Sequence, residues 1–228
     1  MEQRRDSATA YIILADGFET IEALTPLDVL RRCGVEVTTI SLNKTRAVRS
    51  SHGVTVEADA TMEDFMHNCN CCASGTGTGT NSSIAGSSTS ASSSSTTAST
   101  STNVSGTMRQ ALILPGGYPG YKNLCESAEV GALITQFHKE GKLLCAICGA
   151  PTALKANQIC QGAAITCHTS VKEELSDYYS ILSSAVVKYM NIITGMGAGR
   201  SLDFAFAIAE SLTSKEKVEE IKAKMEII

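Results

Sequence analysis

The sequence predicts an α/β fold, in which a mainly parallel sheet is covered by helices on both faces. Short apolar runs typical of buried strands alternate along the chain with stretches whose apolar residues recur at helical spacing. Such alternation favours strand–helix–strand units and therefore a parallel sheet with both faces buried. The chain has 228 residues, 43% of them hydrophobic, which is enough for one domain of this class.

The first part of the chain predicts two strands with a helix between them. Residues 11–15 are an apolar run and residues 35–42 are rich in β-branched side chains, so both predict strands. Between them, four apolar residues recur at helical spacing before the helix stop at Gly34: Ile21, Leu24, Leu27 and Leu30. Residues 54–58 predict a shorter strand, and residues 61–64 a weak helix start.

The second part of the chain repeats the alternation. Strands are predicted at residues 111–114, 143–147 and 163–166, with one or two more within 186–194. Helices are predicted over residues 130–137, from Pro151 onward, from an N-cap at Ser201 to Glu210, and over 213–225. The last of these has the charge pattern of a solvated helix face.

A low-complexity stretch interrupts this order at about residues 73–107. It consists almost entirely of Ser, Thr, Gly and Ala, which cannot bury enough apolar area to offset the entropy of ordering the chain. It lies between the weak helix and the next strand, where an insertion leaves a sheet intact. We therefore expect one domain over residues 1–228, interrupted by a disordered surface insertion.

Composition narrows the class of function. The formal net charge of -4 does not favour nucleic-acid binding. No apolar run is long enough for a signal peptide or a membrane span, so no membrane association is expected. The nine cysteines are odd in number and scattered through predicted strands and helices. Free thiols in a reducing, cytoplasmic setting are the better interpretation, with nuclear or organellar presence left open.

The run from Lys142 to Leu154 carries the chemistry. An apolar strand ends at Ile147, Cys148 and Gly149 follow, and Pro151 suits the first turn of a helix. Strand, sharp turn, nucleophile and helix are the parts of a nucleophile elbow. A thiol at the N-terminal end of a helix is expected to ionise more readily than a free thiol.

Other interpretations of the cysteines stand beside this one. A cysteine at the end of an apolar strand is usually an inert core thiol. Cys145 and Cys148 also have the C-x-x-C spacing of a dithiol, but Cys145 lies inside the predicted strand. A histidine and three cysteines could in principle bind zinc, but their spacing matches no closed zinc module and we expect no metal site: His67, Cys69, Cys71 and Cys72.

The elbow, the turn at Pro115-Gly116-Gly117 and the region of His168 together resemble the DJ-1/ThiJ/PfpI superfamily. The likeness is closer to the branch of the parkinsonism-associated deglycase and its bacterial and protist relatives. It extends over four runs, residues 15–34, 111–129, 144–154 and 194–210. The resemblance implies a flavodoxin-like sandwich that is commonly a homodimer and needs no cofactor.

The resemblance also implies roles for particular residues. The nucleophile falls on Cys148, the acid that hydrogen-bonds it on Glu22, and a nearby histidine on His168. Gly116, Gly117 and Gly149 are expected to bind the substrate or its developing oxyanion. A protonated Glu22 would donate to the sulfur or move a proton once the thiolate has added to a carbonyl, and His168 would move a proton during enediol rearrangement.

The implied reaction converts methylglyoxal or glyoxal to a hydroxy acid without glutathione, or removes early glyoxal adducts from proteins. The partner is therefore a small dicarbonyl or a glycated protein. The alternative is a redox-sensing or chaperone-like stress protein with little turnover, because the same cysteine is a candidate for oxidation to sulfinic acid. An amidotransferase-like hydrolase is a third reading, but its histidine–acid pair does not occur after His168.

The sequence departs from the family pattern at two places. Met196 stands where the family often has arginine, and Arg200 is displaced along the loop, which puts anion binding at the entrance in question. Gly149 follows the nucleophile where the protease-like branch has histidine, which argues against a peptidase.

Overall fold

A seven-stranded sheet forms the centre of the molecule, in a computed structural model that describes residues 8–68 and 109–227. The strand order is β10-β11-β7-β6-β1-β2-β5. Its strands are β1 (Thr9–Leu14), β2 (Glu36–Ser41), β5 (Ala60–Thr61), β6 (Gln110–Leu114), β7 (Leu143–Ile147), β10 (Val186–Tyr189) and β11 (Ile192–Gly195). Neighbouring strands are parallel except β10 and β11, which are antiparallel. The predicted mainly parallel sheet is confirmed.

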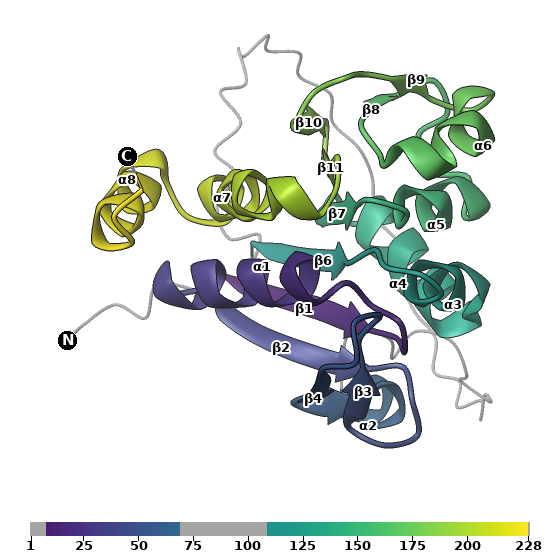
Figure 1. Cartoon of the computed structure of the whole chain (residues 1–228), viewed down its shortest axis with the longest axis horizontal. Helices are drawn as coiled ribbons and strands as arrows, with labels where there is room; N and C mark the ends of the chain where they lie inside the picture. The colour runs from purple at the N-terminus through teal and green to yellow at the C-terminus, as the bar shows by residue number, and fades with distance from the viewer. Residues whose placement is uncertain (1–7, 69–108, 228) are drawn as a thin grey trace, which may run out of the picture.

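Helices cover both faces of the sheet (Figure 1). Helices α1 (Thr20–Arg32), α7 (Ser201–Leu212) and α8 (Lys215–Lys224) pack with one core, while α2 (Met62–Asn68), α4 (Ala128–Lys139) and α5 (Pro151–Ala156) pack with the other. Alternate strand residues serve the two cores: Ile12 of β1 belongs to the first and Ile13 to the second. This two-sided burial explains why β1, β6 and β7 are mostly apolar rather than alternating.

The sequence did not predict several short elements. These are the strands β3 (Ala47–Arg49) and β5, the helices α3 (Gly120–Glu126) and α6 (Lys172–Ser176), and the strand β9 (Ser180–Ile181), which pairs with the predicted β8 (Ala164–Ile165). The strand predicted at 54–58 is β4 (Thr55–Glu57), but it pairs with β3 in a separate hairpin rather than joining the central sheet. Such elements are too short to show a hydrophobic period.

The predicted N-cap at Ser201 is wrong. Arg200 occupies the N-cap position of α7 without a side-chain cap. The hydroxyl of Ser201 instead donates to the carbonyl of Ala198, 2.8 Å away, in the short 3-10 turn that precedes the helix.

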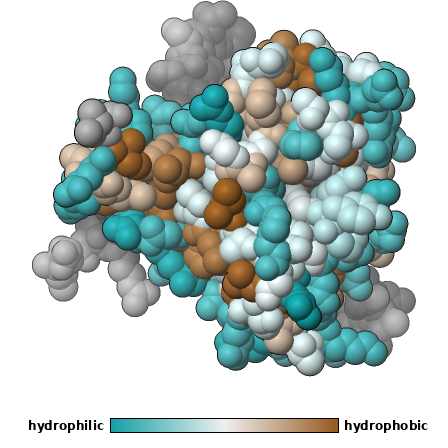
Figure 2. All heavy atoms as spheres, in the orientation of Figure 1, coloured by the Kyte–Doolittle hydropathy of each residue, from teal (hydrophilic) through white to brown (hydrophobic). Residues whose placement is uncertain are grey.

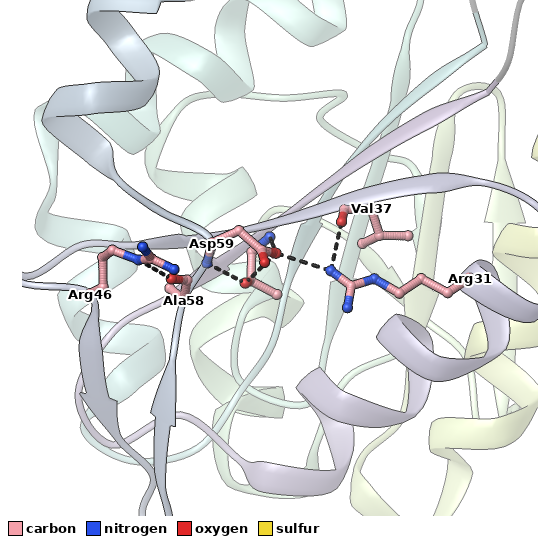
Figure 3. Close-up of polar contacts among 6 residues, drawn as sticks. Arg31, Val37, Arg46, Ala58 and Asp59 are labelled. Atoms are coloured by element: carbon pink, nitrogen blue, oxygen red, sulfur yellow. Dashed lines mark hydrogen bonds and ion pairs between the residues drawn. The ribbon is translucent and has the colours of Figure 1, made fainter.

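A carboxylate ties the edge strand β5 to its neighbour β2. Figure 3 shows Asp59 pointing toward the side chain of Arg31, which reaches across from α1. Asp59 Oδ2 accepts from the backbone N–H and the hydroxyl of Thr39, both at 2.8 Å, and from Arg31 Nη2 at 3.0 Å. Burial acts to raise the pKa of Asp59, but the Thr39 bonds and the Arg31 charge outweigh it and lower that pKa.

Some predictions lie outside the described residues. They include the insertion at 73–107 and the cysteines Cys69, Cys71 and Cys72 of the zinc interpretation. Within the described ranges, no three His, Cys, Asp or Glu residues are grouped so as to hold a metal ion. The helices of the same ranges are all too short or too polar to cross a membrane.

Candidate active site

Cys148 occupies a strained turn between β7 and α5. Its φ is +65°, a left-handed conformation that non-glycine residues rarely adopt. Hydrogen bonds fix the turn on both sides: Cys148 N–H donates to the carbonyl of Gly195 at 3.0 Å, and the carbonyl of Cys148 accepts from the N–H of His168 at 2.9 Å. Pro151 begins α5, as predicted. The turn presents a partly exposed thiol at the carboxyl edge of the sheet.

Glu22 reaches this thiol from the first turn of α1. Its side chain is fully buried, and its Oε2 accepts a 2.9 Å hydrogen bond from the N–H of Gly116. A Cβ placed on Gly116 would lie 2.7 Å from Glu22 Oε2 and 3.0 Å from Cys148 Sγ, so the acid and the sulfur face the same point. The second oxygen, Oε1, is buried and accepts no hydrogen bond within the described chain. The carboxyl of Glu22 is therefore shielded from solvent where it meets the thiol.

Burial raises the pKa of both groups. It raises the pKa of Glu22 to about 7, opposed by the Gly116 N–H and the Cys148 thiol and helped by the negative charge of Glu19. Burial also raises the pKa of Cys148 to about 12, and the charge of Glu22 adds to this, while the N–H groups of Gly117 and Gly149 lower it. Each group is among the causes that shift the pKa of the other, so a proton that the site gains or loses belongs to the pair rather than to one residue.

This geometry corrects the expectation that position alone ionises the thiol. Helix α5 has only six residues, and burial of Cys148 outweighs the two N–H groups that favour its thiolate. A thiolate near neutral pH requires that the shared proton lie on Glu22, because a charged Glu22 further raises the pKa of Cys148.

The three predicted glycines have different places around the pair. Gly116 gives its N–H to Glu22, so its amide holds the acid. The N–H groups of Gly117 and Gly149 are directed to the sulfur. A Cβ on Gly117 would lie 2.3 Å from the backbone nitrogen of Glu19, and one on Gly149 would lie 2.6 Å from the ring of Tyr121, so neither position has room for a side chain. Their role in binding an oxyanion stays a prediction.

His168 adjoins Cys148 through the backbone, and its imidazole is exposed. Its Nδ1 lies 2.8 Å from the hydroxyl of Ser170 and accepts from the N–H of Ser170 at 3.2 Å. Its Cδ2 faces Gly197, at 3.4 Å from where a Cβ on that residue would stand. The histidine thus lies at the rim beside the late loop, and its part in proton transfer stays a prediction.

Cys145 and Arg200 bear on the dithiol and anion-binding interpretations of the sequence. Cys145 is fully buried in β7, and burial strongly raises its pKa, which speaks against a dithiol with Cys148. Arg200 lies on the surface, where its guanidinium is 3.6 Å from Asp203. A cleft of about 850 Å³ is lined by residues of α3, α4 and α5, among them Cys125 and Gly131, and neither Cys148 nor Glu22 lines it.

Three contributors to the site were not predicted. Tyr121 of α3 packs against Gly149, the carbonyl of Gly195 holds the elbow, and Glu19 places a charge next to Glu22. Glu19 is three residues before Glu22, so helical spacing could have indicated the contact between them. The other two contacts join segments far apart in the sequence and leave no local signal.

The sequence model of the DJ-1/PfpI family matches residues 8–211. The chain belongs to the DJ-1/PfpI family. It is 32% identical to Protein dj-1beta of Drosophila melanogaster over 216 residues, which cover 94% of this chain and 95% of the relative. It is 30% identical to the Parkinson disease protein 7 homolog of Danio rerio over 218 residues, 95% of each chain.

The fold agrees with this family. The crystal structure of Drosophila melanogaster DJ-1beta matches with a TM-score of 0.77 and 30% identity, over 97% of this chain and 99% of that one. The expected flavodoxin-like fold is thereby confirmed. A further family relative, the Glutathione-independent glyoxalase DJR-1.2 of Caenorhabditis elegans, is 38% identical over 107 residues, 46% of this chain and 56% of the relative.

The buried carboxyl of Glu22 is expected to make the free energy of unfolding depend on pH. Because folding raises the pKa of Glu22 from 4.5 to about 7, its stabilising contribution is present below about pH 4.5 and is lost as the pH rises to about 7. Glu22→Gln is therefore expected to raise the free energy of unfolding by about 3 kcal/mol at about pH 8 and by little near pH 4. Chemical denaturation at the two pH values checks this, and an equal gain at both would contradict it.

Proposed function

We propose that the chain is a cofactor-independent enzyme of the glyoxalase or deglycase type, which acts on methylglyoxal, glyoxal or their early adducts through Cys148. The observation that carries the proposal is the buried Glu22 carboxyl facing a partly exposed thiol at a left-handed turn. The proposal is supported by membership of a family in which one relative is named a glutathione-independent glyoxalase.

The first step uses the shared proton. With that proton on Glu22, the Cys148 thiolate attacks the aldehyde carbon and a C–S bond forms as the C=O π bond opens. We propose that the N–H groups of Gly117 and Gly149, which are directed to the sulfur, receive the developing oxyanion. Glu22 then gives its proton to that oxygen, which leaves a neutral hemithioacetal and a carboxylate.

The second step is an internal redox exchange. The hydrogen on the former aldehyde carbon leaves as a proton and returns to the adjacent ketone carbon through an enediol, with His168 as the proposed carrier. The aldehyde carbon becomes a thioester and the ketone becomes an alcohol, so no external oxidant or reductant is needed. Water then cleaves the C–S bond, which releases the 2-hydroxy acid and returns the thiolate and one proton to the pair.

Purified protein tests the proposal by its consumption of methylglyoxal without glutathione. We expect conversion to lactate, with kcat/KM rising through an apparent pKa of about 7 as the free enzyme's pair loses its first proton. A flat pH profile, or a product other than a hydroxy acid, would contradict the mechanism. Absence of turnover together with two oxygen atoms added at Cys148 by mild peroxide would favour the redox-sensing alternative instead.

We also propose that the chain forms a homodimer through the face of α1 and α7. Ile21 of α1 is 48% exposed and Leu202 of α7 is 43% exposed. Figure 2 shows hydrophobic residues gathered on the side of the molecule where these helices lie. Light scattering is expected to give twice the mass of the chain, and Ile21→Lys to give a monomer. A wild-type monomer at working concentrations would contradict this proposal without bearing on the chemistry.

A further inference from the structure

Two tyrosine side chains lie near the amides that face the sulfur of Cys148. Tyr121 of α3 lies over Gly149, and Tyr118 directly follows Gly117 in the chain. The N–H groups of Gly117 and Gly149 are the two that lower the pKa of Cys148. The centroids of the two tyrosine rings are 6.3 Å apart, and the ring planes are inclined at 57°. Tyr118 and Tyr121 thus form one aromatic wall next to the thiol.

The ring of Tyr121 presents its flat side to the elbow. A Cβ placed on Gly149 would lie 2.6 Å from Cδ1, 2.7 Å from Cγ and 2.9 Å from Cε1 of that ring. An approach along the edge would bring one atom much closer than its neighbours, so these nearly equal distances place the glycine under the face. Burial is the main cause that raises the pKa of Tyr121, and the sulfur of Cys148 adds to it. A group attached to that sulfur therefore has the ring as a neighbour.

Close backbone packing holds the aromatic wall in place. A Cβ on Gly117 would lie 2.3 Å from the backbone nitrogen of Glu19, and one on Gly120 would lie 2.6 Å from that of Phe18. The N–H of Tyr121 donates to the carbonyl of Gly117 at 2.9 Å. The segment that carries both rings is therefore pressed against the loop before α1. A ring held in this way loses little freedom when a ligand packs on it, so the contact contributes more to binding.

Charge around the aromatic wall favours a neutral ligand. Tyr118 is 67% exposed, and Lys122 Nζ lies 5.6 Å from the centroid of its ring. A cation thus already occupies Tyr118 and would repel a second one. Within the described ranges, the side chain that shifts the pKa of Cys148 is the acid Glu22, and no cation is among the causes. An anionic substituent therefore gains no partner at the sulfur, whereas a neutral flat group meets the rings without an unpaired charge.

We propose that Tyr121, together with Tyr118, is a specificity-determining residue that favours aldehydes bearing a neutral aromatic ring, such as aryl glyoxals. The inference rests on the proposed attack of Cys148 on an aldehyde carbon. That attack places the rest of the substrate beside the aromatic wall, where a second ring can pack on the tyrosines in an offset or edge-to-face contact. Such a contact is expected to favour a phenyl substituent over a small one by about 2–10-fold.

Two alkylating reagents with the same reactive carbon, iodoacetamide and N-phenyl iodoacetamide, measure this preference. The measured quantity is the ratio of their rates at Cys148, located by mass spectrometry and divided by the same ratio for N-acetylcysteine in solution. The degree of ionisation of the thiol cancels, because both reagents meet the same thiolate. We expect a normalised ratio for the phenyl reagent of about 2–10 in the wild type and in Tyr121→Phe, which keeps the ring. In Tyr121→Leu, which keeps only an apolar contact with Gly149, we expect it to approach unity.

Equal ratios in the wild type and Tyr121→Leu would overturn the inference, and so would a ratio in Tyr121→Phe as low as in Tyr121→Leu. If Tyr121→Leu failed to fold, as judged by circular dichroism, Tyr118→Leu decides, because Tyr118 is 67% exposed. A ratio below that of the wild type then supports the inference, and an unchanged ratio overturns it. Alkylation needs no glyoxal turnover, so a normal ratio in a protein that converts neither phenylglyoxal nor methylglyoxal would contradict the proposed function alone.

Discussion

Replacing Cys148 with serine is expected to lower methylglyoxal consumption by at least about 10³-fold, to the rate of buffer alone. A serine hydroxyl does not ionise near neutral pH, and it cannot share a proton with Glu22 as the thiol does. The replacement keeps the Cβ and therefore the backbone strain of the turn at φ +65°, so the fold should persist.

Cys160→Ser is the matched control for this variant. Cys160 is also a partly exposed thiol in a left-handed conformation, with φ of +49°. Its sulfur lies 3.7 Å from His138 Nε2, in a different part of the structure. Steady-state assays should show wild-type turnover in Cys160→Ser. If Cys148→Ser retained a substantial share of the activity, the nucleophile would have to be sought elsewhere.

Gly116→Ala should damage the site without removing any of its functional groups. The added Cβ would lie 2.6 Å from the Cβ of Cys148 and 2.7 Å from Glu22 Oε2, distances that carbon and oxygen atoms cannot hold without moving. The acid and the thiol must therefore separate. We expect turnover to fall by about 10²-fold and the free energy of unfolding by about 1–3 kcal/mol. Turnover assays and denaturant titrations measure the two losses.

Gly131→Ala is the control for crowding alone. A Cβ on Gly131 of α4 would also approach an oxygen at 2.7 Å, but that oxygen ends the side chain of Asn157, which can rotate away. We expect turnover in this variant to equal that of the wild type. Wild-type turnover in Gly116→Ala would show that the contact between Glu22 and Cys148 does not matter for the chemistry.

The local signals of the sequence were sufficient for the elbow. The apolar run 143–147 and Pro151 predicted a strand, a tight turn and a helix start, and the structure has all three. The alternation of apolar runs likewise predicted the class of the sheet. Patterns of this kind can be recognised from the sequence alone, because each depends on residues that are neighbours in the chain.

The interactions across the site were not available from local patterns. Gly116 and Glu22 are 94 residues apart, and only the family resemblance indicated that the acid belongs to the site. The expected ionisation of Cys148 considered its position at a helix start, whereas burial by distant segments raises its pKa.

The central claim is that Glu22 holds the shared proton and leaves the sulfur as thiolate. Its most direct test is the rate of Cys148 alkylation against pH in the wild type and in Glu22→Gln. The account predicts that the wild-type sulfur is alkylated near neutral pH, and that the midpoint lies higher in the variant, because a neutral amide cannot take up the proton of the thiol while burial still raises the pKa of Cys148. A wild-type thiol that stays unreactive until well above about pH 9 would place the proton on sulfur and contradict the account.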